Sequence, residues 1–189
     1  MMGGILAGTY VATPNGWRAV ETLLPGDVVL TFESGPQALV RVERLALPEV
    51  AEIGLRLVWP LKVPVGAMEN RQGIVLLPEQ RVLIESDAAE ELYGQPFVLV
   101  PAAALMGFRG IDLCPVGARP AFSLQFAADQ IIYGGRGMLL HCPSPASKVT
   151  EYPLLTAAQA RTLVAGMMAE DLGRSLYQTG YGGGQAAFT

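Results

Sequence analysis

The sequence predicts an all-β fold, mainly β-strands with short connections. Two observations point to it. The 189 residues include 22 glycines and 14 prolines, a share of helix-breaking residues that argues against a helical bundle. From Ile5 to about Cys142, short runs of strand-forming residues alternate with turn residues. With 51% hydrophobic residues, the chain is long enough to form one domain with a substantial core.

The predicted strands are runs of strand length with turn residues at their ends. The run at 28–32 ends at Glu33-Ser34-Gly35-Pro36, and the run at 39–47 alternates apolar with charged residues. In the run at 55–65, Pro60 and Pro64 predict an edge strand or a kinked pair, because proline cannot donate to a strand ladder. Further strands are expected at 74–77, 81–84, 97–100, 121–126 and 130–133.

Three turns follow from their residue types. Pro14-Asn15-Gly16 predicts a hairpin, and Pro25-Gly26-Asp27 predicts a turn that leads into a buried strand. Gly134-Gly135-Arg136-Gly137 is similar to a glycine-rich anion loop, but no helix start follows it. A hairpin turn is the better interpretation.

Two helices are expected. Ser86 is placed to cap a short one, with Asp87 in its first turn and Gly94 as its stop. Thr156 and Gln159 have the spacing of a capping box that begins a longer one. The longer helix has an apolar face, which consists of Ala160, Leu163, Val164, Met167, Met168, Leu172 and Leu176. We expect this face to pack on the β body, with docking to a partner as the alternative.

The chain divides into three expected parts. Residues 1–142 form the β domain, and residues 143–153 form a linker that is rich in proline and serine. Residues 154–189 carry the helix and a glycine-rich tail, which pack on the body or on a partner. The tail from Tyr177 has too little apolar surface to fold by itself.

Composition excludes several classes of function. A net charge of −4 and 16% charged residues leave no cationic surplus for a phosphate backbone, so we expect no nucleic-acid partner. Cys114, His141 and Cys142 make three ligands at most, too few for a closed zinc site of about four. We expect free thiols, no metal and no cofactor.

The sequence predicts a soluble protein. The longest apolar stretch without charge, 97–108, contains Pro101 and is far shorter than the roughly 20 residues of a membrane-spanning helix. No basic residue precedes an apolar segment at the start of the chain, so we expect no classical signal peptide. The sequence does not decide the cellular location of the protein. One option is the cytoplasm, before assembly or export.

The order of motifs resembles a known family. Residues 8–16 have the pattern G-T-x-V-x-T-x-x-G, and residues 21–29 have E-x-L-x-P-G-D-x-V. Together they resemble the opening block of the Hint domain, which hedgehog autoprocessing domains and inteins share. Residues 77–83 are similar to the family's second block, and residues 92–105 and 153–156 resemble its bacterial subfamily.

The resemblance implies a horseshoe-like β fold that cleaves or rearranges its own peptide bond. In that chemistry, a Cys or Ser at the first position of the domain attacks the preceding carbonyl. A His at the end of a T-x-x-H-like motif then protonates the leaving nitrogen. Acyl transfer needs both an activated nucleophile and a positioned acid-base group.

This sequence departs from the family pattern at each of these positions. The nucleophile position falls on Gly4, the Thr position on Leu77 and the His position on Gln80. Neither glycine nor glutamine can perform the family's chemistry. Only three residues precede Gly4, which predicts little upstream peptide to release.

His141 and Cys142 are the alternative catalytic candidates. In inteins, a His near the C-terminal splice junction is followed by an Asn and then by a Cys, Ser or Thr. Here Cys142 follows His141 directly, without the Asn. Because neighbours in a strand point to opposite faces, we expect one to be buried and the other exposed at a strand end.

We therefore expect a non-catalytic Hint-like structural or binding module, a component of a larger protein assembly such as a phage-like particle or a secreted or surface complex. Its partners would be other proteins, bound through the C-terminal helix and tail. The alternative is an autoprocessing domain that uses Cys142 and His141. No constellation of residues supports a third class, a small-molecule enzyme.

Overall fold

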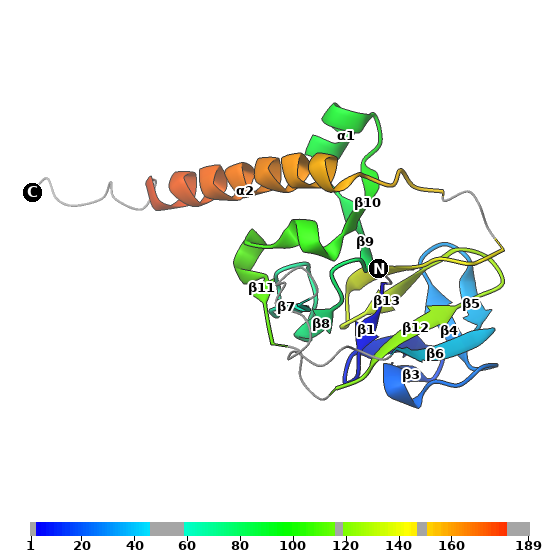
Figure 1. Cartoon of the computed structure of the whole chain (residues 1–189). Helices are drawn as coiled ribbons and strands as arrows, with labels where there is room; N and C mark the ends of the chain where they lie inside the picture. The colour runs from blue at the N-terminus through cyan, green and yellow to red at the C-terminus, as the bar shows by residue number, and fades with distance from the viewer. Residues whose placement is uncertain (1–2, 46–58, 116–118, 147–150, 181–189) are drawn as a thin grey trace, which may run out of the picture.

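The computed structural model describes residues 3–45, 59–115, 119–146 and 151–180. Within these ranges the chain is mainly β, with two α-helices and short 3-10 helices (Figure 1). The predicted all-β class is confirmed. The C-terminal helix lies across one end of the β body, and its second half extends beyond it (Figure 1).

Two antiparallel sheets form the body. In spatial order, the six-stranded sheet contains β11 (Asp112–Leu113), β7 (Leu61–Val63), β8 (Ile74–Leu76), β1 (Ile5–Leu6), β12 (Ala121–Gln125) and β6 (Arg41–Leu45). The eight-stranded sheet contains β10 (Phe97–Pro101), β9 (Arg81–Glu85), β14 (Met138–Cys142), β13 (Gln130–Gly134), β2 (Tyr10–Thr13) and β3 (Gly16–Ala19), with β4 (Val28–Thr31) and β5 (Gly35–Ala38) attached through β13.

The chain crosses from one sheet to the other between β8 and β9. The crossing is a four-residue turn, Leu77-Pro78-Glu79-Gln80. On one side of it β1 pairs with β8, so that Ile5 lies opposite Leu76. On the other side β14 pairs with β9, and Leu140 lies opposite Val82. The N-terminal strand and the strand that ends at Cys142 therefore meet at this turn.

The predicted turns are present. Residues 14–15 connect β2 to β3, and Gly134–Gly137 close the β13–β14 hairpin, where Ile131 pairs with His141. The prediction of an edge strand or kinked pair around Pro60 and Pro64 is wrong, because the two prolines lie outside β7. The strand can therefore pair on both sides, with β11 and β8. Part of the run at 55–65 lies outside the described residues.

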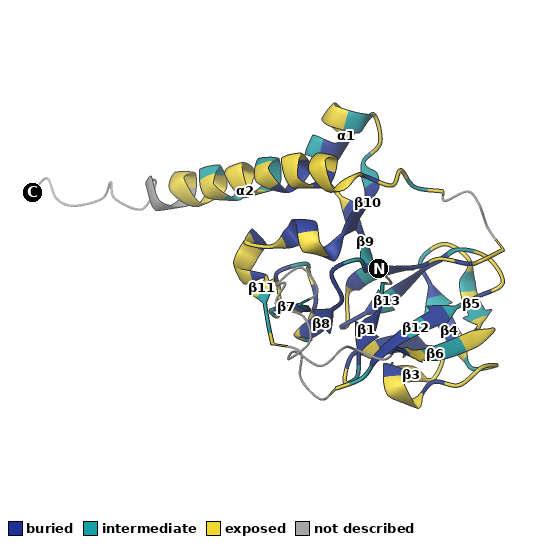
Figure 2. Cartoon of the chain, viewed as in Figure 1, coloured by how far each residue is buried: buried dark blue, intermediate teal, exposed yellow. Residues whose placement is uncertain are grey.

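The main core lies between the sheets and under the C-terminal helix (Figure 2). A second, smaller cluster contains Leu6, Leu45, Val75, Leu77 and Ala121. It borders Gly4, because Leu45 and Leu77 are the side chains nearest to that residue.

Both helices begin near the predicted residues. Helix α1 (Asp87–Tyr93) follows Ser86 and ends at Gly94, whose φ of 70° is left-handed, but the Ser86 side chain makes no capping bond. Helix α2 (Ala157–Gly180) begins with the predicted capping box. There the Thr156 backbone amide donates to Gln159 Oε1 at 3.0 Å, and the Gln159 amide donates to Thr156 Oγ1 at 3.3 Å.

The buried apolar contacts of α2 come from its first half. Ala160, Leu163 and Val164 are buried against β10, α1 and the 3-10 helix η4 (Ala102–Leu105). Met168, Leu172 and Leu176 are exposed. Along the series Val164, Met168, Leu172 and Leu176, each side chain is rotated by about 40° around the helix axis relative to the one before it. The reason is that an α-helix has about 3.6 residues per turn. The apolar face predicted as one stripe therefore divides into a buried part and a solvent-exposed part.

No helix among the described residues is long and apolar enough to cross a membrane.

We predict that Leu163→Ala destabilises the protein by about 2–5 kcal/mol, because it leaves a cavity where α2 meets the body. Leu163 is fully buried, whereas Leu172 on the same helix is 63% exposed. The matched control Leu172→Ala should change the free energy of unfolding by less than about 0.5 kcal/mol. Urea unfolding measures both values, and equal losses would contradict this packing.

Candidate functional site

The three residues that the motif resemblance aligns with the family's catalytic positions lie together at the turn between the sheets. The Leu77 amide donates to the Gly4 carbonyl at 3.0 Å, and the Gln80 amide donates to the Leu77 carbonyl at 3.0 Å. Gly4 directly precedes β1, and Gln80 directly precedes β9. The structure thus brings together Gly4, Leu77 and Gln80, as the resemblance implies.

Gly4 lies in close contact with the terminal methyl groups of two leucines. It is buried, and a Cβ built on it would lie 2.7 Å from Leu45 Cδ1 and 3.0 Å from Leu77 Cδ1. Carbon atoms in van der Waals contact lie about 3.5–4.0 Å apart. A cysteine or serine at this position would therefore have to displace two leucines that are themselves buried.

Gln80 has a structural role at the position of the family's histidine. Its side chain is buried, and its Nε2 donates to the His141 carbonyl at 2.8 Å and to the Arg81 carbonyl at 3.0 Å. These bonds fix the turn to β14. Because a carboxamide does not titrate near neutral pH, Gln80 cannot act as an acid or base.

His141 lies beside Asp129, which the sequence did not single out. His141 Nε2 is 3.3 Å from Asp129 Oδ2, and the Ser144 amide donates to Asp129 Oδ1 at 2.6 Å. Ser144, within the predicted linker, is buried. The one available signal for Asp129 was its place in the short turn before β13, where Asp is common for conformational reasons alone.

The imidazole of His141 is favoured in its neutral form. Burial lowers its pKa from the ordinary value of 6.5, and this effect exceeds that of Asp129, which raises the pKa. His141 Nδ1 is buried and has no hydrogen-bond partner among the described residues.

Cys142 is buried, and its surroundings disfavour the thiolate. Its side chain belongs to the main core, and burial together with the charge of Asp129 raises the pKa of its thiol to about 12. His141 and Cys142 are 6% and 4% exposed, so the prediction that one of them is exposed is wrong. The reason is that β14 lies between β9 and β13, with both of its faces covered.

A cavity of about 570 Å³ opens beside this cluster. It is lined by Gly3, Gln80, Asp129, His141, Cys142 and Ser144, among others. No group of three or more His, Cys, Asp or Glu side chains within the described ranges is arranged to hold a metal ion. The cavity lining thus offers hydrogen-bonding groups and the imidazole of His141. Gly4, beside it, has no side chain that could act as a nucleophile.

The lowered pKa of His141 predicts a pH-dependent stability. Because the folded-state pKa lies below that of the unfolded chain, the unfolded chain binds the proton first as pH falls. Wild type should therefore lose stability relative to His141→Gln as pH falls below about 6.5. Urea unfolding of both proteins between about pH 8 and pH 5 tests this, and a constant difference over that range would contradict it.

Comparisons with known proteins identify the family of this chain. A model of the Hint domain matches residues 4–136, which is more than half of the chain and begins at Gly4. A comparison with curated proteins found no match.

Among solved structures, the bacterial intein-like domain from Clostridium thermocellum is similar, at 16% identity and a TM-score of 0.49. The match covers 75% of this chain and 99% of that one. The MchDnaB-1 intein (N145AA) matches with 16% identity and a TM-score of 0.49, over 74% of this chain and 99% of that one. The gp41-1 intein has 12% identity and a TM-score of 0.45, over 75% and 99%.

The family-model match over most of the chain, together with the motif order, shows that this chain belongs to the Hint domain family.

Proposed function

We propose that this protein is a Hint domain that does not process itself and that serves as a structural and binding module in a larger protein assembly. One observation carries the proposal. At Gly4, where the family has its nucleophile, Leu45 and Leu77 occupy the space that a side chain would need. The residue is therefore part of a packed surface rather than an open catalytic position.

The remaining groups of the site support the same conclusion. The Gln80 amide is used for two backbone contacts that hold β14. The Cys142 thiol stays protonated at neutral pH because its pKa is about 12. A thiol attack assisted by His141 requires the thiolate, which this environment disfavours.

The exposed apolar side chains on the second half of α2 support a role in binding. Leu172 and Leu176 are 63% and 64% exposed, and Met168 is exposed beside them. Large apolar side chains that gather on a surface are typical of sites where proteins meet other proteins. Under this proposal, α2 presents them to a component of the assembly.

The test is the intact mass of the purified full chain after long incubation with and without a strong thiol nucleophile. We expect one unchanged mass at neutral and mildly alkaline pH, because no thiolate lies next to a strained or activated peptide bond. Cys142→Ala and Cys114→Ala are matched variants, each lacking one of the two cysteines.

A thiol-dependent break near residue 142 would overturn the proposal if it occurs in wild type and Cys114→Ala and is lost in Cys142→Ala. That pattern would instead establish the alternative, autoprocessing by Cys142 with His141.

A further inference from the structure

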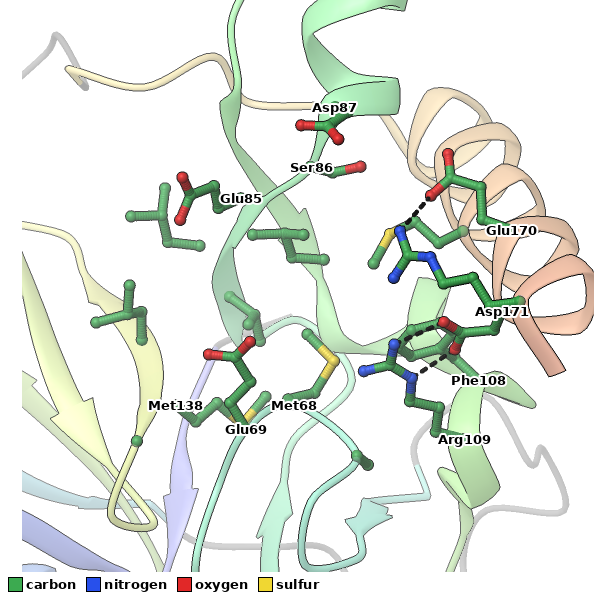
Figure 3. A pocket seen from close by; sticks show the side chains of 18 residues that line it. Met68, Glu69, Glu85, Ser86, Asp87, Phe108, Arg109, Met138, Glu170 and Asp171 are labelled. Atoms are coloured by element: carbon green, nitrogen blue, oxygen red, sulfur yellow. Dashed lines mark hydrogen bonds and ion pairs between the residues drawn. The ribbon is translucent and has the colours of Figure 1, made fainter. Parts of the chain in front are cut away.

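A groove of about 350 Å³ lies between α2 and the β body, away from the Gly4 cluster (Figure 3). Its walls come from β9 and the start of α1 on one side, from the loop at 67–69 below, and from α2 with Arg109 on the other. No residue is shared between the linings of this groove and of the cavity beside Gln80.

Half of the groove lining is apolar, and methionine is prominent in it. Met138 lies buried beneath the floor, and the half-buried Met68 comes from the lower loop (Figure 3). The half-buried Met167 comes from α2. Ile84 and Leu139 add branched side chains. Methionine side chains are flexible and polarizable, so they adapt to apolar partners of different shapes.

The rim of the groove is acidic. Arg109 forms a bidentate ion pair with Asp171, in which Nε donates to Oδ2 at 2.5 Å and Nη2 donates to Oδ1 at 2.7 Å. Arg174 Nη2 lies 3.6 Å from Glu170 Oε2. Both guanidinium groups of the lining are thus neutralised within the groove. Three further exposed carboxylates, Glu69, Glu85 and Asp87, line it and form no hydrogen bond or ion pair with the residues that the structure describes.

We propose that this groove binds a basic amphipathic segment of a partner protein, whose apolar side chains contact the methionine floor and whose Lys or Arg side chains pair with Glu69, Glu85 and Asp87. This inference rests on the proposed binding function and adds the groove as a contact site apart from the exposed face of α2. Amphipathic helices commonly bind in apolar grooves, and opposite charges at the edge select and orient them. An acidic segment would be repelled by the same rim.

The first test is a titration of the full chain with a fluorescent synthetic helix built from Leu and Lys. Glu69→Gln/Glu85→Gln removes two rim charges, and the control Glu90→Gln/Glu91→Gln removes two charges from α1 residues that do not line the groove. We expect the rim variant to weaken binding by at least about tenfold, and the control by less than about twofold. A peptide with Glu in place of Lys should not bind.

The second measurement locates the peptide. With ¹³C-labelled methionine methyl groups, we expect the signals of Met68 and Met167 to shift on binding. Met106 and Met168 are exposed but do not line the groove, and their signals should stay in place.

Equal weakening by the two double variants would overturn the proposal, since net charge alone would then explain binding. Shifts at Met106 or Met168 equal to those at Met68, or the absence of saturable binding, would overturn it as well. If the chain keeps its intact mass but fails these binding tests, the groove is not the binding site. The proposal that the protein does not process itself would then still stand.

Discussion

The structure depends on the close packing at the turn between β8 and β9, where the chain leaves one sheet for the other. Gly4 contacts Leu77 there through a backbone hydrogen bond, and Gln80 reaches across to the His141 carbonyl. The Ala102 amide at the start of η4 donates to the Gln80 carbonyl at 2.8 Å. Because η4 in turn supports α2, this single turn connects both sheets and the C-terminal helix.

The same packing supports the proposal that this Hint domain does not process itself. A self-cleaving site must keep room for a nucleophile and a titrating group beside it. Here the first position is closed by Leu45 and Leu77, and the second holds an amide that bonds to the backbone. Such contacts stabilise a core, because apolar side chains fill space and buried polar atoms find partners.

The sequence was most informative where local chemistry decides the structure. Pro14-Asn15-Gly16, Gly94 and the Thr156–Gln159 pair predicted a hairpin, a helix end and a capping box, and each depends on neighbouring residues only. The burial of both His141 and Cys142, the role of Asp129 and the division of the α2 face depend on which strands and helices pack together, and one sequence does not contain that information.

The claim that packing has closed the nucleophile position is tested most directly by a double-mutant cycle with Gly4→Cys and Leu45→Ala. The account predicts that Gly4→Cys alone lowers the free energy of unfolding by about 1–3 kcal/mol, because the added atoms overpack the core. It also predicts that the double variant is more stable than the sum of the single changes, since the smaller side chain makes room for the cysteine. Additive effects, or a Gly4→Cys protein as stable as wild type, would contradict the account.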